Sequence, residues 1–460
     1  MSPTYDAVLI GAGLASLTAA RSLAGSRIAI VEARNRVGGR ALTTQETPQP
    51  VDLGCSMIHG FREGNPAAKL ITGELGMDVY IPEGAKGLVY GNDGPLSEAD
   101  ATSLFATSAQ NAFAPPPSVP ADVSIASLLF PNLKNDARLV ALARTAEIGS
   151  GEVLEKQSAK YAGFEQGFGG TDAFPVGGYG AEVVHNLLAD VKAAGGEVFL
   201  NEEVVSLEDL GATEGVKLTT KSGKELIAKA VISTIPHAVL REAPPKFSPP
   251  LSRQFTSAIE RMRTGALEKV VLTYPSAWWP SPSDSGSFLL LPLTDSASTD
   301  KPPSLRDLFS RSTIPVTSFQ RIASTPHPTL LGYLGADAAR YISSYSEEEV
   351  ACAFHAYLVE RLAPSSPSSV PEPTTKIVTS WLRDPYSRGA TSTPVLLTQS
   401  SDGEPNSPLD YILVARPQWE GRLGFAGEHT DLDNHGSVAG AVISGRREGE
   451  RVRELLERLA

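Results

Sequence analysis

The pattern of apolar and polar residues divides the start of the chain into a strand, a helix and a second strand. Residues 5–10 (YDAVLI) form a short, mostly apolar run that is typical of a buried strand. Residues 14–23 have apolar side chains at helical spacing, and residues 27–32 (RIAIVE) form another apolar run. This order predicts the opening unit of a doubly wound α/β sheet.

Similar patterns return later in the chain. Residues 182–193 have helical spacing, and short apolar runs predict strands within 195–207, 216–220 and 230–234. Near the end, residues 422–426 (RLGFA) predict one more strand, and a terminal helix follows at 436–459. Elements of one α/β sheet are therefore expected from well-separated parts of the sequence.

A chain of 460 residues is too long for one ordinary hydrophobic core, so two domains are expected. We predict an α/β fold with a discontinuous Rossmann-type domain formed by residues 1–85, 181–245 and 405–460. The remaining segments, 86–180 and 246–404, are predicted to form an interleaved α+β substrate-binding domain.

The turn after the first strand, GAGLAS, is rich in small residues. Gly11 and Gly13 permit a tight turn and let backbone N–H groups approach a pyrophosphate at the helix N-terminus, next to Ala15. Ser16 stands where such motifs usually have a third glycine, but it is small enough for close packing. Glu32 ends the second strand, where an acid accepts ribose hydroxyls. These residues predict a dinucleotide site.

The segment that begins with Glu32, EARNRVGGRA, resembles the second FAD signature of the flavin-containing amine oxidases, the family of polyamine and monoamine oxidases. The resemblance implies FAD as the cofactor and makes Arg34 and Arg40 cofactor contacts. Paired glycines bring the backbone close to the dinucleotide, while Arg40 offers a planar cationic fork to its phosphates.

The resemblance continues in order along almost the whole chain, through VDLGCSMIHG, NEEVVSL, VISTIPHAVL with KFSPPL, SWLRDPYSRGA and the stretch GEHTDLDNHGSVAG. It implies that Val204 packs near the adenine and that Trp381 faces the flavin. It also implies that Glu428 accepts hydroxyls of the ribityl chain and that the backbone N–H of Val438 meets the pyrimidine end of the ring. Further expected cofactor contacts are Met57 and Ser437.

Two residues are candidates for catalysis. Lys269 occupies the family position of a lysine that holds a water against flavin N5, and strand alternation places it on the face of Leu267 and Val271. The alternative is a strand lysine that extends to solvent or pairs with an acid. His59 resembles a histidine of animal-type polyamine oxidases, which suggests contact with the substrate amine. Its alternative is a hydrogen-bonded structural residue.

Net charge and composition indicate which binding partners, cofactors and location to expect. A net charge of −12 argues against nucleic acid and suits a cationic substrate. No run of about 18 apolar residues predicts a membrane helix, and no basic n-region or C-terminal peroxisomal tripeptide is present, so we expect a cytoplasmic protein. No metal-ligand spacing was found, so no metal is expected. The two cysteines indicate no disulfide framework, and because residues 425–438 contain none, we expect noncovalent FAD.

The resemblance implies an FAD-dependent oxidase of amines, most of all polyamines, that removes hydride to give an imine and reduces O2 to hydrogen peroxide. Small or flexible residues at positions near family aromatics, Ser437, Thr391 and Met57, leave another amine, such as a monoamine or an amino acid, as an alternative. A flavin-bound interaction protein without catalysis is an alternative of another class. The polar residues His429, Asp431, Asp433 and His435 suggest a metal cage in isolation, but are expected to be exposed loop residues.

Overall fold

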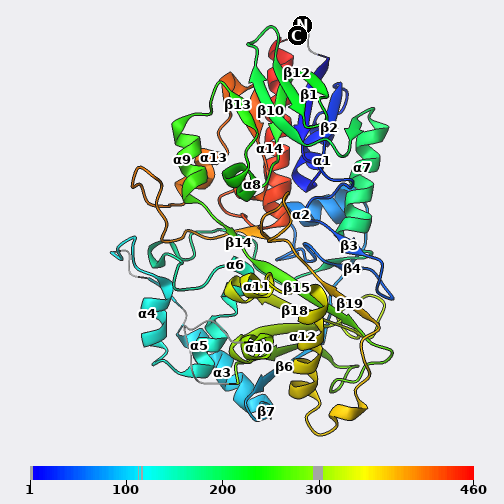
Figure 1. Ribbon diagram of the computed structural model, residues 1–460, viewed down its shortest axis with the longest axis vertical. Helices are drawn as coiled ribbons and strands as arrows, with labels where there is room; N and C mark the ends of the chain where they lie inside the picture. The colour runs from blue at the N-terminus through cyan, green and yellow to red at the C-terminus, as the bar shows by residue number, and fades with distance from the viewer. Residues whose placement is uncertain (1–3, 112, 116–117, 294–303, 460) are drawn as a thin grey trace.

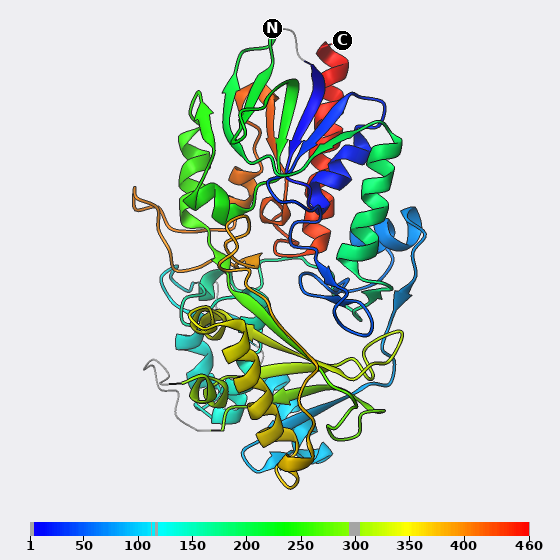
Figure 2. The ribbon, with the colours of Figure 1, turned by 45° about the vertical axis from the view of Figure 1, so that its right-hand side comes forward.

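The computed structural model describes residues 4–111, 113–115, 118–293 and 304–459. Two large sheets form the upper and lower halves of the molecule in Figure 1, and the first strand and the last helix of the chain both reach the top. The turned view in Figure 2 keeps the same division, with strands of the lower half extending up toward the upper half.

The upper sheet has the order β13-β10-β11-β12-β1-β2-β9, and β21 pairs with β12 beside this path. Its strands are β1 (Tyr5–Ile10), β2 (Ile28–Val31), β9 (Glu197–Phe199), β10 (Val204–Asp209), β11 (Val216–Thr220), β12 (Glu225–Ser233), β13 (Lys246–Ser248) and β21 (Leu423–Phe425). β1 lies parallel between β12 and β2, and β12 is also parallel to β21. These parallel pairs join the start, middle and end of the chain, as the sequence predicts.

Both faces of β1 are buried, which explains its continuous apolar run. Ala7 and Leu9 face a core shared with α1 (Leu14–Ser22), α7 (Val184–Ala193) and α14 (Val438–Leu459). Val8 and Ile10 face the opposite core, which includes α9 (Arg253–Arg261) and α13 (Leu409–Val414). The sheet is therefore covered by helices on both sides, which confirms the predicted α/β class.

The lower sheet has the order β19-β15-β18-β17-β16-β6-β7 and is antiparallel except where β16 meets β6. Its strands are β6 (Lys86–Gly91), β7 (Gly94–Pro95), β15 (Leu267–Thr273), β16 (Ser285–Leu290), β17 (Ile314–Ser318), β18 (Thr329–Gly335) and β19 (Thr375–Val378). Its largest core cluster packs against α10 (Leu305–Arg311), α11 (Ala336–Ile342) and α12 (Glu347–Leu362). Lys269 lies near the start of β15 and contacts the N-terminal segment at Asp52 and Gly54.

The remaining strands and α-helices complete the connections. They are β3 (Thr43–Thr44), β4 (Val51–Asp52), β5 (Val79–Tyr80), β8 (Phe174–Pro175), β14 (Thr264–Gly265), β20 (Thr391–Ser392), α2 (Pro66–Ala68), α3 (Glu98–Gln110), α4 (Ile125–Asn132), α5 (Ala137–Ala143), α6 (Ala146–Ser150) and α8 (His237–Glu242). Both β13 and α9 pack in the upper half although they follow residue 245. The exact domain boundaries stay a prediction.

Candidate active site

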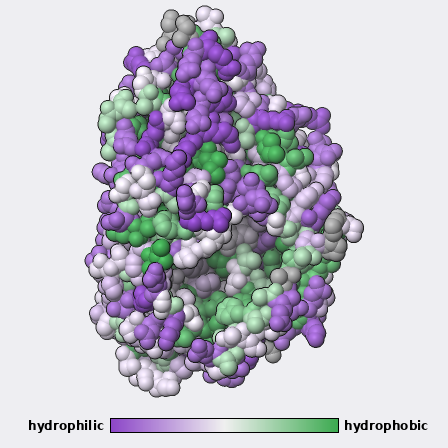
Figure 3. Space-filling view, turned by 180° about the vertical axis from the view of Figure 1, so that it is seen from behind, coloured by the Kyte–Doolittle hydropathy of each residue, from purple (hydrophilic) through white to green (hydrophobic). Residues whose placement is uncertain are grey.

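A cavity of about 580 Å³ lies where the two halves meet. All the predicted cofactor and catalytic residues line it, although they come from opposite ends of the chain: Gly11, Gly13, Ala15, Glu32, Arg34, Arg40, Met57, His59, Val204, Lys269, Trp381, Glu428, Ser437 and Val438. Figure 3 shows that the face opposite to that of Figure 1 is hollowed at this level, with hydrophobic residues along the lower side of the hollow. The structure thus brings the predicted set together, while their individual roles stay predictions.

The glycine-rich turn offers backbone rather than side chains to the cavity. Gly11 has φ +94°, and a Cβ there would lie 2.6 Å from Thr234 Oγ1. Gly13 forms a bridge with Gly38 and precedes α1, whose N-cap has no side-chain hydrogen bond and whose first turn has no acid. The first N–H groups of the helix are therefore available to an anion, as binding of a pyrophosphate requires.

Glu32 is fixed beside this turn. Its two carboxylate oxygens accept hydrogen bonds from the backbone N–H groups of Ala12 at 2.7 Å and Arg34 at 2.8 Å. The residue is buried yet lines the cavity. Because each ionised oxygen can accept more than one hydrogen bond, ribose hydroxyls fit this acceptor.

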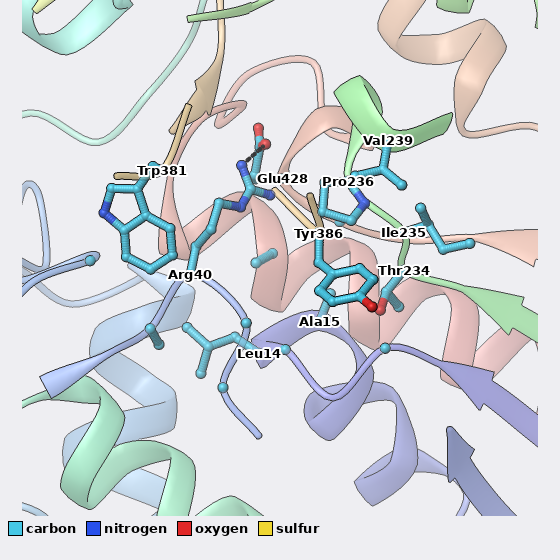
Figure 4. Close-up of a pocket in the computed structure, with 18 of the residues that line it drawn as sticks. Leu14, Ala15, Arg40, Thr234, Ile235, Pro236, Val239, Trp381, Tyr386 and Glu428 are labelled. Carbon is cyan, nitrogen blue, oxygen red and sulfur yellow. Dashed lines mark hydrogen bonds and ion pairs between the residues drawn. The ribbon is translucent and has the colours of Figure 1, made fainter. Parts of the chain in front are cut away.

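Arg34 and Arg40 are held by segments from the far end of the chain. Arg34 Nη2 donates to both oxygens of Asp384, at 2.9 and 2.8 Å, and its guanidinium lies 5.4 Å from the centre of the Tyr386 ring. Arg40 Nη1 donates to Ala390 O at 2.9 Å and to Glu428 Oε1 at 2.8 Å. Figure 4 shows the Arg40–Glu428 pair between Trp381 and the segment that carries Thr234 to Val239.

Three donors hold the carboxylate of Glu428 in the cavity. Besides Arg40, it accepts hydrogen bonds from Ser392 Oγ and from the backbone N–H of Gly436. Burial alone would raise the pKa of Glu428, but Arg40 and the neighbouring donors outweigh it and lower the pKa to about 2. The residue is therefore an ionised acceptor at neutral pH, as a partner of ribityl hydroxyls should be.

Lys269 neither extends to solvent nor pairs with a nearby carboxylate oxygen among the described residues. Its Nζ donates to Asp52 O at 2.9 Å, Gly54 O at 2.6 Å and Ser56 Oγ at 3.5 Å. Burial lowers its pKa to about 8, against the opposing effects of Asp52 and Cys55. A buried lysine with a pKa this close to neutrality is suited to hold a water or to exchange a proton.

Trp381 contributes a flat wall. It is 7% exposed, and its Nε1 donates to Leu53 O at 3.2 Å, which fixes the indole against the segment that follows β4. A fixed aromatic plane beside glycine backbone fits a stacked or edge-on ring system such as a flavin.

A second cavity of about 290 Å³ adjoins the first. The two share Met57, His59, Gly149, Thr391, Gly436, Ser437 and Val438. The second is also lined by the carboxylates Glu165 and Asp433, and its described lining residues include no lysine or arginine. An acidic chamber therefore lies beyond the wall where the substrate is expected.

The expectation that His429 and His435 are exposed is wrong. His429 is 1% exposed and packs 6.3 Å from the His237 ring, and burial lowers its pKa to about 3. The His435 ring stacks on Phe164 and Tyr411, and its Nε2 lies 3.2 Å from Glu165 Oε1. Aromatic partners far away in sequence bury both rings, so local polarity is a poor guide here. No group of three or more potential metal ligands occurs in the described part of the chain.

Several side chains at the site are not predicted from the sequence. Asp172 lies 3.1 Å from His59, Tyr333 lines the cavity opposite Lys269 on the neighbouring strand, and Asp384 holds Arg34. No local pattern marks these residues, since each acts through a partner from another segment. Only the alternation of β18 offers a weak signal, because it places Tyr333 on one face of its strand.

Comparison with known proteins supplies the family. The model described as flavin containing amine oxidoreductase matches residues 14–453. A similar protein is lysine-specific histone demethylase 1 homolog 3 of Arabidopsis thaliana, 29% identical over 98% of this chain but only 30% of its own length. Polyamine oxidase 2 of A. thaliana is 26% identical over 98% of this chain and 89% of its own length. Polyamine oxidase 3 of Oryza sativa subsp. japonica is 25% identical, with 99% and 91% covered.

These matches confirm the family resemblance and the FAD cofactor predicted from the sequence. Among the described helices, none is long and apolar enough to cross a membrane. The cavity fits the cofactor on independent grounds: glycine backbone at a helix N-terminus, an acid at the end of the second strand, and an ionised acceptor paired with Arg40. The chain belongs to the flavin-containing amine oxidoreductases, the FAD-dependent family that its cavity fits.

Proposed function

We propose that the protein is an FAD-dependent oxidase of amines, with polyamines as its preferred substrates. Bound FAD would supply the hydride acceptor for oxidation of the carbon next to nitrogen, and O2 would restore it with release of hydrogen peroxide. The substrate becomes an imine, which water hydrolyses. The observation that carries the preference for polyamines is the acidic second chamber, which adjoins the flavin cavity through His59 and Ser437.

The two ends of a polyamine need different surroundings. The reacting nitrogen must be neutral, which the largely apolar wall near Trp381 and Met57 favours. A second nitrogen is cationic at neutral pH, and Glu165 and Asp433 supply carboxylates for it. A monoamine would use only the first of these surroundings.

Each of the cavity residues would have a separate role in binding FAD or the amine. The backbone of the turn with Gly11 and Gly13 binds the pyrophosphate, and Glu428 orients the ribityl chain. Lys269 holds a water, while His59 contacts the substrate amine. A flavin-bound protein without catalysis would have no need for a buried lysine of lowered pKa, so Lys269 supports an enzyme.

Oxidation of another amine is the second candidate. Ser437 and Thr391, which have small side chains, and the flexible Met57 line the wall between the two cavities, so a bulky monoamine or an amino acid has room there. The similarity to a histone demethylase homolog adds N-methylated lysine peptides to the compounds that must be tested.

The test is anaerobic reduction of the purified yellow holoenzyme, followed by the visible flavin band. The panel contains spermine, spermidine, N-acetylated polyamines, tyramine, amino acids and a dimethyl-lysine peptide. Bleaching by polyamines alone supports the proposal, bleaching by tyramine, an amino acid or the peptide instead overturns the polyamine preference, and no bleaching overturns the oxidase itself.

A double variant tests whether the second chamber binds the cationic nitrogen of a polyamine. Changing Glu165→Gln together with Asp433→Asn should raise KM for spermine about tenfold and leave KM for any monoamine unchanged. The surface change Glu360→Gln, in a pair with Arg306 that is 38% and 68% exposed, is the matched control. Equal effects on both substrate types would contradict the assignment of the chamber.

A further inference from the structure

His59 and Asp172 lie opposite each other beside an isolated antiparallel bridge. Ile58 and Ala173 form an antiparallel bridge, with N···O distances of 2.8 and 3.2 Å. Both bridge residues are buried, at 1% and 0% exposure, and face the core. His59 and Asp172 are the next residues along the two sides of this bridge, and their side chains are 61% and 39% exposed rather than packed in the core. Their pairing thus follows from the register of the bridge.

The carboxylate of Asp172 is oriented by two neighbours. Its Oδ2 lies 3.1 Å from His59 Nδ1, and its Oδ1 accepts the backbone N–H of Gly60 at 3.1 Å. On the other side, the buried Asn65 Nδ2 donates to the carbonyl oxygens of His59 and Gly60, at 2.8 and 3.0 Å. Hydrogen bonds therefore fix both the backbone of His59 and the carboxylate of Asp172.

The charge of Asp172 decides which ring nitrogen of His59 carries the proton. Burial alone would raise the pKa of the Asp172 carboxyl, but His59 and the Gly60 N–H outweigh it and lower the pKa. An ionised carboxylate can only accept hydrogen bonds, so Nδ1 must be the protonated nitrogen. Nε2 is then the acceptor of the neutral ring, on a residue that lines both cavities.

We propose that Asp172 is a positioning residue, which fixes the ring orientation and tautomer of His59 so that Nε2 takes the proton from the substrate ammonium. The inference rests on the proposed function, because it assumes an amine that must become neutral before its carbon is oxidised. One N–H bond of the substrate breaks and one N–H bond forms at Nε2. The positive charge moves to the imidazole, where the Asp172 carboxylate offsets it, and the proton then passes to solvent through the exposed side of the ring.

The first test reads the tautomer and needs no substrate. Ring ¹⁵N shifts are measured on histidine-labelled holoenzyme, and the signals of His59 are assigned by their loss in His59→Gln. The Asp172→Asn variant has one oxygen, which the Gly60 N–H occupies, so its amide N–H₂ faces Nδ1. The proton of the ring should then move to Nε2. Asp172→Glu keeps the charge and should keep the tautomer of the unaltered protein.

The second test measures the rate at which the substrate reduces the flavin. A positioned acid or base contributes about a hundredfold or more, and loss of its partner alone should slow flavin reduction on the order of tenfold. This loss should appear in kcat with little change in KM, and Asp190→Asn, in a surface pair with Arg21, should have no effect.

An unchanged tautomer in Asp172→Asn overturns the proposal, and so does a changed tautomer with flavin reduction within about twofold of normal. A changed tautomer together with slower reduction supports it. If no amine bleaches the flavin, the proposed function fails, and the tautomer of His59 still shows whether Asp172 positions the ring.

Discussion

Replacement of Glu428 by Gln tests whether the buried Arg40–Glu428 pair stabilises the protein. The pKa of Glu428 falls from the ordinary 4.5 to about 2, although burial opposes the fall. A fall of this size stabilises the ionised carboxylate in the folded protein by about 3 kcal/mol. The side chain is 9% exposed, so solvent screens this value little.

The sign of the pH dependence follows from the same values. Because the pKa is depressed by folding, the stabilisation is present in full above pH 4.5 and is lost as the pH falls toward 2. Gln has no charge to lose. Glu428→Gln should therefore lower the free energy of unfolding by about 3 kcal/mol at pH 7, and this difference should shrink by about 1 kcal/mol at pH 4.

Urea unfolding of the apoprotein, followed by tryptophan fluorescence at pH 7 and pH 4, measures both differences without the contribution of FAD binding. Glu360→Gln breaks an exposed ion pair with Arg306 and should cost less than about 1 kcal/mol. A Glu428→Gln protein within about 1 kcal/mol of the unaltered one at pH 7, or a difference that does not change with pH, would refute the reasoning.

Two further predictions concern the same cavity. Lys269→Met should slow reoxidation of the flavin by O2 at least about tenfold in stopped-flow experiments, because no buried amine is left to hold a water. Lys376→Met, which removes a surface ion pair, should not slow it. Unchanged oxidase kinetics in Lys269→Met would contradict the role of Lys269. Gly60→Ala should lower the free energy of unfolding by about 3 kcal/mol or more, since φ is +60° and the new Cβ would lie 2.3 Å from Phe168 O. Gly64→Ala is the control: its φ is +86° but the space around it is open, so it should lower the free energy of unfolding by about 1 kcal/mol. Similar melting temperatures for the two alanine variants would show that the contact with Phe168 is not rigid.

Much of the upper half could be predicted because its signals are local. β1 and β11 have the predicted bounds, and α14 begins only two residues after the predicted helix start. A strand buried on both faces produces a continuous apolar run whatever it packs against, so its sequence is easy to interpret. The helix predicted at 182–193 begins instead as a π-helical turn, Tyr179–Val183, which no sequence spacing distinguishes from an α-helix.

The residues predicted to bind the cofactor carry a local sequence signal, and the other residues of the cavity do not. Gly11, Gly13 and Glu32 belong to one strand–turn–helix–strand unit, so a short motif is enough to predict them. Asp172 and Asp384 act on His59 and Arg34 across 113 and 350 residues. Neither their spacing nor their neighbours in sequence could show these contacts, and the burial of His429 and His435 depends on partners that are equally remote.

This difference has a consequence for substrate choice. The cofactor end of the cavity is built from glycine backbone, a helix N-terminus and a buried ion pair, which tolerate little change because each is fixed on several sides. The wall toward the second chamber consists of side chains from separate segments, among them Met57, Thr391 and Ser437. A substitution there alters the room for the amine without moving the backbone that would hold FAD. The same cofactor site can therefore serve different amines, and the acidic chamber, rather than the dinucleotide motif, is where specificity should be sought.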